Sequence, residues 1–251
     1  MSCVNIRGCC IGEGRPKVII PIVEPTETAV LEKAAEFSTL RADCVEWRID
    51  CFEGAKDLPA IVHCAAKLRV ALKDQLLLFT FRTKSEGGKV ALAHEEYLHF
   101  IRTVLATDCA DLIDIEFFTA GADLPSLIED AHTAGVKVVC SSHDFHKTPP
   151  CAELVSRMVA MQQAGADLPK LAVMPQSRAD VLELLAATAE MADRHPETPI
   201  ITMSMGALGA VSRLSGEAIG SAMTFANPGQ ASAPGQVSLE VVNEVLDALH
   251  L

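Results

Sequence analysis

The sequence predicts an α/β protein, a (β/α)8 TIM barrel preceded by a short N-terminal hairpin. The chain has 251 residues, and barrels of this class typically have about 250. A short apolar, β-rich segment followed by a segment of helical periodicity occurs eight times, the number that closes such a barrel. The alternative is an open doubly wound sheet, but no GxGxxG motif follows the first strand.

The expected strands are short and rich in Val, Ile, Leu or Phe, as strands buried on both faces should be. They cover residues 18–23, 44–48, 76–82, 112–116, 137–143, 168–174, 200–204 and 222–225. Residues 1–15 precede the first strand and are expected to form the hairpin or a short lid. No linker interrupts the alternation, so we expect a single domain over 1–251.

The expected helices lie between these strands, and several carry end signals. Ser177 with Asp180 indicates a capping box, and Ser238 is a good N-cap for the last helix. Gly135 and Gly165 stand where two helices should end. The helices cover residues 26–40, 57–72, 92–107, 124–134, 151–164, 178–194, 207–219 and 239–250.

Composition argues against several classes of protein. The net charge of −12, with no basic stretch, argues against nucleic-acid or acidic-membrane binding. No apolar run approaches the roughly 20 residues of a membrane span, and no signal peptide is visible, so we expect a cytoplasmic protein. The nine cysteines are odd in number and lack CxxC spacing, which favours reduced thiols over a disulfide framework or a zinc site.

Charged residues interrupt several strands at positions that should face the inside of the barrel. Side chains alternate between outside and inside along each strand, and the carboxyl ends of barrel strands carry the chemistry. Burying many charges where strands converge costs desolvation free energy, which a functional role would explain. These residues therefore predict an active site. The alternative is a structural network of salt bridges. The residues are Glu46, Arg48, Arg82, Asp114, Glu116, His143 and Lys170.

Lys170 is the most informative of these residues. Leu171 and Val173 should face the helices, which places Lys170 inside the barrel. A lysine amine attacks carbonyls only when it is neutral, a form that burial and nearby arginines favour. The alternative is an ion pair with Glu46 or Glu116.

His143 ends a neighbouring strand, where an imidazole could both take and give a proton. The alternative for this residue is a hydrogen-bonded core histidine. Glu86 follows the third strand beside Gly87 and Gly88, and glycines permit close packing into the barrel mouth, although a loop glutamate is usually solvated. The small, polar segment 232–236 follows the last strand, where it could close over a ligand or be an ordinary connection.

Taken together, these segments resemble type I 3-dehydroquinase. The matching stretches occur in order over nearly the whole chain, and their combination is highly specific. They are EWRID at 46–50, LFTFRTKSEGG at 78–88, SSHDFHKTP at 141–149, LPKLAVMPQ at 168–176, ITMSMG at 201–206 with SRL at 212–214, and ASAPGQ at 231–236.

The resemblance implies a barrel, usually a homodimer, that dehydrates the small molecule 3-dehydroquinate to 3-dehydroshikimate in the shikimate pathway. It implies that no metal or organic cofactor takes part. Lys170 would form the Schiff base, His143 would shuttle protons and Glu86 would orient His143. The implied substrate-binding residues are Glu46, Arg48, Arg82, Arg213, Ser232 and Gln236, with Arg213 holding the substrate carboxylate.

Two other functions suit the same fold. A class I aldolase also needs a strand-end lysine, but it usually binds a phosphorylated sugar, and residues 204–209 are not a convincing glycine-rich phosphate site. A non-catalytic binding barrel would not need Glu86, His143 and Lys170 together.

Overall fold

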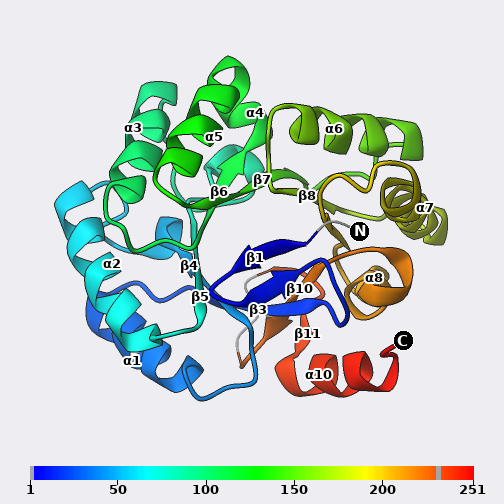
Figure 1. Cartoon of the computed structure of the whole chain (residues 1–251), viewed down its shortest axis with the longest axis horizontal. Helices are drawn as coiled ribbons and strands as arrows, with labels where there is room; N and C mark the ends of the chain where they lie inside the picture. The colour runs from blue at the N-terminus through cyan, green and yellow to red at the C-terminus, as the bar shows by residue number, and fades with distance from the viewer. Residues whose placement is uncertain (1–2, 230–232) are drawn as a thin grey trace.

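Eight parallel strands form a closed ring surrounded by helices in the computed structural model, which describes residues 3–229 and 233–251 (Figure 1). The ring closes where Ile200 forms a parallel bridge with Ser221 and accepts a hydrogen bond from the Ala222 N–H at 2.8 Å. The short strand β11 (Val237–Ser238) adds to the edge of β10. The eight strands are β3 (Lys17–Ile22), β4 (Cys44–Arg48), β5 (Leu76–Thr80), β6 (Leu112–Glu116), β7 (Lys137–Asp144), β8 (Leu168–Val173), β9 (Ile201–Ser204) and β10 (Met223–Asn227). The predicted barrel is therefore confirmed.

The helices follow the predicted order. Ser177 and Ser238 accept the N-cap hydrogen bonds of α7 and α10, and Gly135 and Gly165 have positive φ angles of 74° and 100° after their helices. The longer helices are α1 (Glu27–Phe37), α2 (Leu58–Leu72), α3 (His94–Leu105), α5 (Leu124–Thr133), α6 (Cys151–Gln163), α7 (Arg178–Arg194) and α10 (Leu239–Ala248). Shorter elements are α4 (Phe117–Ala120) and the 3-10 turns η1 (Ile49–Cys51), η2 (Lys84–Glu86) and η3 (Gly121–Asp123).

One predicted helix differs from the structure. The segment 207–219 forms two short helices, α8 (Ala210–Leu214) and α9 (Gly216–Ile219), separated at Ser215. The Gly216 carbonyl accepts hydrogen bonds from both Gly220 and Ser221. A Cβ at Gly216 would lie 2.7 Å from the Ser221 carbonyl oxygen. The chain turns back toward the sheet at this close approach, so one continuous helix does not form.

The strands separate two apolar cores. Outward side chains such as Trp47, Phe79 and Leu171 pack with the helices, as the predicted alternation requires. Inward side chains such as Leu112 and Leu168 fill the N-terminal end of the barrel interior. The interior is therefore apolar at one end and polar at the other, and the polar end carries the candidate site.

A hairpin of β1 (Val4–Ile6) and β2 (Cys9–Ile11) closes the apolar end of the barrel. The two-residue turn at Arg7 and Gly8 has positive φ angles of 49° and 79°, as a type I′ turn requires. Ile11 is fully buried among the first residues of the strands. The hairpin lies across the middle of the ring of strands in Figure 1, so it is a plug at the end opposite the site.

The hairpin also corrects the expectation that the cysteines are all reduced. Cys3 and Cys10 form a disulfide, and the other seven cysteines are free. The antiparallel pairing brings the two Cα atoms to 5.6 Å, within the range for a disulfide. The hairpin turn brings these two cysteines together, and the spacing of cysteines in the sequence does not predict that turn.

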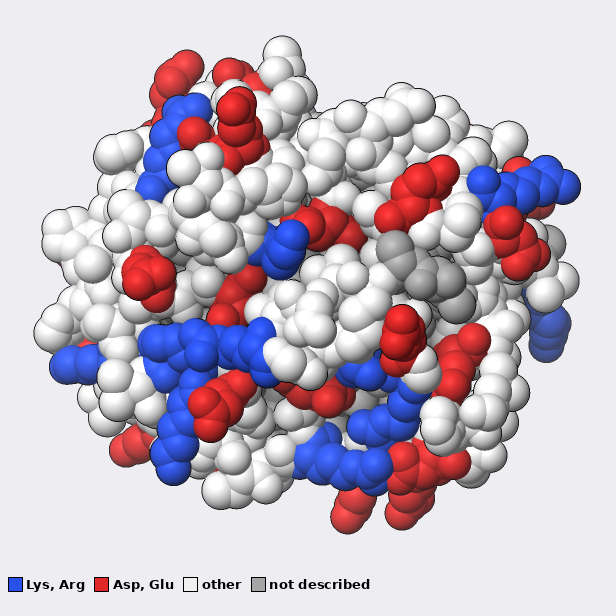
Figure 2. All heavy atoms as spheres, in the orientation of Figure 1, with Lys and Arg blue, Asp and Glu red and all other residues white. Residues whose placement is uncertain are grey.

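The surface of the described residues matches the composition. None of their helices combines the length and apolar character that a membrane span requires. On the hairpin side of the molecule, Lys and Arg lie beside Asp and Glu rather than in a basic patch (Figure 2).

Candidate active site

A cavity opens at the carboxyl ends of the strands, and eight of the nine predicted site residues line it. Ser232, the ninth, lies outside the described residues. Apolar side chains complete the wall, including Phe145, Met203, Met205 and Phe225. The predicted residues in the wall are Glu46, Arg48, Arg82, Glu86, His143, Lys170, Arg213 and Gln236.

Lys170 lies deep in this cavity, with 3% of its side chain exposed. Its Nζ is 3.1 Å from Oδ2 of Asp114 and 4.6 Å from the centroid of the Phe225 ring. The ion-pair partner is thus Asp114 rather than Glu46 or Glu116. Glu46 instead accepts a hydrogen bond from the Thr80 hydroxyl at 2.8 Å.

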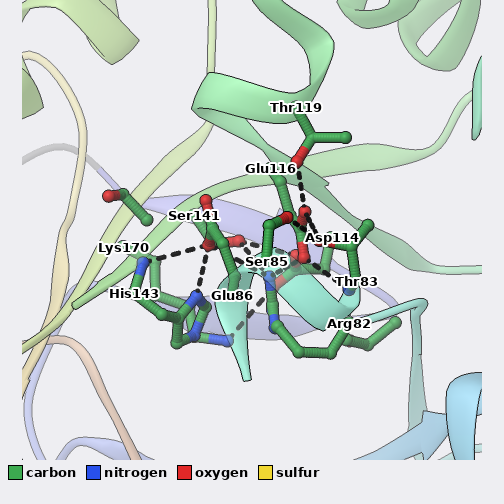
Figure 3. Close-up of polar contacts among 12 residues, drawn as sticks. Arg82, Thr83, Ser85, Glu86, Asp114, Glu116, Thr119, Ser141, His143 and Lys170 are labelled. Carbon is green, nitrogen blue, oxygen red and sulfur yellow. Dashed lines mark hydrogen bonds and ion pairs between the residues drawn. The ribbon is translucent and has the colours of Figure 1, made fainter. Parts of the chain in front are cut away.

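Arg82 connects the two acids of β6. Its Nη2 donates to Asp114 Oδ2 at 2.7 Å, and its Nη1 donates to Glu116 Oε1 at 2.9 Å and to the Ser141 hydroxyl at 3.0 Å. Ser141 in turn donates to Asp114 Oδ1 at 2.7 Å. Figure 3 shows these bonds joining Arg82, which follows β5, to side chains of β6 and β7. The geometry fixes the position of Asp114 from both of its oxygens.

Glu116 anchors the loop that carries Glu86. It accepts hydrogen bonds from the Thr83 backbone N–H at 2.8 Å and from the Thr83 hydroxyl at 2.7 Å. The glycine pair then lets the loop pack closely. A Cβ at Gly87 would lie 2.3 Å from the Phe145 ring, and one at Gly88 would lie 1.8 Å from the Arg82 carbonyl oxygen. The loop glutamate is therefore buried rather than solvated.

Glu86 and His143 form a hydrogen-bonded pair. Glu86 Oε2 lies 2.8 Å from His143 Nδ1 and also accepts the His143 backbone N–H at 3.0 Å. Burial raises the pKa of Glu86 to about 8. Burial, with the charges of Arg82 and Lys170, holds the pKa of His143 well below its usual value. The imidazole is therefore neutral near pH 7. In the tautomer in which Nδ1 carries the proton and donates it to Glu86 Oε2, Nε2 is free to act as a base.

Arg213 is a buried cation with no carboxylate partner among the described residues. Its Nη2 donates to the Pro234 carbonyl at 3.2 Å, its Nη1 is 3.7 Å from Met203 Sδ, and its Nε has no hydrogen-bond acceptor. Burial lowers its pKa to about 10, so it remains charged at neutral pH. Such a group favours an anionic ligand.

Arg48, by contrast, has a partner of its own. It makes two hydrogen bonds to the Asp50 carboxylate, at 2.8 and 2.9 Å. Of the two guanidinium groups, Arg213 is therefore the one left to neutralise a ligand carboxylate.

The sequence predicts no individual role for several residues of the site. Asp114 is among the acids predicted to point inward, but its contact with Lys170 cannot be predicted from the strand pattern. Ser141 lies two residues before His143 and so shares its face of β7, a signal that could have identified it. Phe225 was assigned only to a strand, because an aromatic residue there is equally typical of an apolar core.

Comparison with known proteins identifies the family. The model of the family described as type I 3-dehydroquinase matches residues 18–251. The chain belongs to the type I 3-dehydroquinase family. The resemblance found in the sequence motifs, and the expectation of an enzyme of this family, are thus confirmed.

Curated members of the type I 3-dehydroquinase family match over almost their full length. The 3-dehydroquinate dehydratase of Bacillus subtilis (strain 168) is 47% identical over 250 residues, which are 100% of this chain and 98% of the relative. That of Bacillus licheniformis is 46% identical over 247 residues, 98% of this chain and 97% of the relative.

Solved structures agree on the barrel. The type I 3-dehydroquinate dehydratase of Clostridium difficile, determined with covalently modified comenic acid, superposes with a TM-score of 0.96 at 42% identity, covering 99% of this chain and 98% of that one. The enzyme of Enterococcus faecalis superposes with a TM-score of 0.93 at 40% identity, covering 99% and 100%.

Proposed function

We propose that this chain dehydrates 3-dehydroquinate to 3-dehydroshikimate, a step of the shikimate pathway, through a Schiff base on Lys170. The observation that carries the proposal is the position of Lys170 Nζ. It is buried in the cavity, in the same wall as the His143–Glu86 pair and the unpaired Arg213. These groups are a nucleophile, a base and a cation for the substrate carboxylate.

Binding of the substrate follows from the charges of the wall. Arg213 holds the carboxylate, because it is the buried arginine without an anion of its own. The other polar residues bind the ring hydroxyls and the carbonyl. We assign this role to Glu46, Arg48, Arg82, Gln236 and Ser232.

The chemistry begins at the ring ketone. The neutral amine of Lys170 adds to the carbonyl carbon, and the resulting carbinolamine takes up one proton and loses its hydroxyl as water to give an iminium. The iminium withdraws electrons, so His143 Nε2 can remove a proton from the adjacent ring carbon and leave an enamine. The enamine expels the neighbouring hydroxyl, which takes the proton from His143 and leaves as water. Hydrolysis of the new iminium frees 3-dehydroshikimate and restores Lys170.

Glu86 acts through His143. Its Oε2 holds Nδ1 and the backbone N–H of the same residue, which fixes the ring and leaves the other nitrogen for the substrate. Because Lys170 supplies the activation, the proposed reaction uses no metal or organic cofactor.

The family resemblance supports three broader proposals. We propose that the chain is one barrel domain, that it forms a homodimer and that it acts in the cytoplasm. Sedimentation velocity of the purified protein tests the dimer, since a monomer of 26.8 kDa would sediment distinctly more slowly.

Trapping with borohydride tests the Schiff base. The enzyme is incubated with 3-dehydroquinate and sodium borohydride, digested and examined by mass spectrometry. We expect the reduced adduct on Lys170, and we expect Lys170→Met to lose both adduct and turnover. The matched control is Lys147→Met, which should keep both, since Lys147 is exposed. An adduct on Lys84 or Lys147, or turnover by Lys170→Met, would refute the proposal.

A further inference from the structure

Asp114 is the carboxylate that contacts the reacting nitrogen. It is fully buried, and its Oδ2 lies 3.1 Å from Lys170 Nζ and 2.7 Å from Arg82 Nη2. The Ser141 hydroxyl holds Oδ1 at 2.7 Å. In the sheet, Ser141 is the register partner of Lys170. The carboxylate is therefore held rigidly beside Nζ.

Within the set of four groups formed by the two acids of β6, Arg82 and Lys170, the charges balance when Nζ is positive. The two acids of β6 are Asp114 and Glu116. Arg82 forms a salt bridge with each of them, and Lys170 forms one with Asp114. Two negative and two positive groups cancel. The face of Phe225, 4.6 Å from Nζ, also favours a cation. This environment suits a nitrogen that carries a charge.

On the basis of the proposed function, we propose that Asp114 is a further catalytic residue, the counter-ion of the Lys170 nitrogen on both sides of Schiff-base formation. Lys170 attacks as the neutral amine after its ammonium has released a proton, and a proton is taken up again when the carbinolamine hydroxyl leaves as water. The net change is ammonium plus ketone to iminium plus water, and positive charge develops on the nitrogen again as the iminium forms. A carboxylate that pairs with the ammonium is already in place for the iminium. Such a preorganised group stabilises developing charge without rearrangement.

The other charged groups of the cavity do not provide this counter-ion. Glu86 is hydrogen-bonded to His143, and Glu46 is hydrogen-bonded to Thr80. Among the described residues, Asp114 is the carboxylate that forms an ion pair with Lys170. The groups facing the cavity besides these are Arg48, Arg82 and Arg213, which are cations.

Asp114 remains ionised in this setting. Burial alone would raise its pKa, but the charges of Arg82 and Lys170 and the Ser141 hydrogen bond outweigh burial, so the pKa of Asp114 lies below its ordinary value. A carboxylate of low pKa holds a proton poorly. Asp114 therefore acts as a fixed counter-ion and not as the proton store of the reaction.

The test is Asp114→Asn, compared with Asp111→Asn. Asp111 is a matched control because it is also buried and paired with arginines, Arg7 and Arg69, but at the hairpin end of the barrel. For Asp114→Asn we expect kcat to fall about 100-fold with KM changed less than about threefold, the size seen when one stabilising group is removed. The rate of borohydride trapping at a fixed pH should fall as well, because the iminium loses its counter-ion. Asp111→Asn should change neither quantity.

Two outcomes would overturn the inference. One is an Asp114→Asn enzyme with the kcat and trapping rate of the parent. The other is a Ser141→Ala enzyme with the kcat of the parent. Ser141→Ala tests the role of Asp114 if Asp114→Asn does not fold. This variant keeps every charge but frees Asp114 Oδ1, and we expect a loss of about threefold to tenfold in kcat at constant KM. Parental kcat in Ser141→Ala would then reject the role of Asp114. Absence of an adduct on Lys170 in the parent would instead refute the proposed function.

Discussion

At the scale of single residues, His143 shows how the cavity prepares a base. Free histidine is half protonated near pH 6.5, but His143 is buried and lies near Arg82, Lys170 and Arg48, and all of these effects lower its pKa. The imidazole therefore stays neutral, and able to accept a proton, at pH values where an exposed histidine would be charged.

This shift predicts the pH dependence of the reaction. A base with a lowered pKa keeps its active form as the pH falls, so kcat/KM should stay level through pH 6.5 and decline only at lower pH.

His143→Ala should still form the trapped imine but lose about 10²- to 10⁴-fold in kcat. Steady-state kinetics between pH 5 and about 8 measures the pH profile of kcat/KM in the parent and kcat in the variant. Circular dichroism at each pH is the control for folding. A decline centred above pH 6.5, or near-parental kcat in His143→Ala, would contradict the assignment.

At the scale of elements, the hairpin and the candidate active site lie at opposite ends of the barrel. Ile11 is buried in the apolar end, whereas Lys170, His143 and Glu86 line the cavity at the other. Stability and catalysis should therefore be separable by mutation, because the hairpin and the charged residues of the cavity lie at opposite ends of the barrel.

Ile11→Ala tests this separation. Removing a buried isoleucine side chain leaves a cavity, and we expect a loss of roughly 2–5 kcal/mol in the free energy of unfolding. At a temperature where the variant is folded, kcat should stay within about twofold of the parent. Urea unfolding and steady-state kinetics provide the two measurements. Val70→Ala is the control, since Val70 is 77% exposed and should change neither; a large drop in kcat for Ile11→Ala would show that the two ends are coupled.

Elements differed in how well local sequence predicted them. The helices with clear end signals, such as α7 with Ser177, closely match their predicted limits. The segment 207–219 did not, because its break at Ser215 arises from the approach of Gly216 to Ser221. Local periodicity contains no information on such a contact between the segment and the sheet.

At the scale of the whole molecule, the barrel gathers residues that are far apart in sequence. Glu46 comes from β4, His143 from β7, Lys170 from β8 and Arg213 from α8. Parallel strands place their carboxyl ends on one side, so one cavity collects the lysine, histidine and arginine to which we assign the roles of nucleophile, base and carboxylate-binding cation. The proposed chemistry needs no further group.

We therefore expect chelation to leave the reaction unchanged. Dialysis against EDTA should not alter kcat or KM for 3-dehydroquinate, because in the proposed mechanism Lys170 activates the ketone through a covalent bond and not through a Lewis acid. The control is the dialysed enzyme with Mg²⁺ or Zn²⁺ added back. A rate that falls on dialysis and recovers with either ion would contradict the cofactor-free mechanism.

The sequence by itself determined the barrel, the inward positions of Glu46, Arg82, Asp114 and Lys170, and the family. Alternation along a strand and periodicity along a helix are local properties, and the motifs are stretches of consecutive residues. These features can be read without knowing which strands are neighbours.

The contacts between groups depend on how the chain folds. The folded chain pairs Lys170 with Asp114, leaves Arg213 without an anion among the described residues, and joins Cys3 to Cys10. Each of these depends on strand register, on a turn or on how far a side chain reaches across the barrel. Burial and neighbouring charge, which set the pKa values of Glu86 and His143, arise from the same contacts, so they exist only in the folded chain.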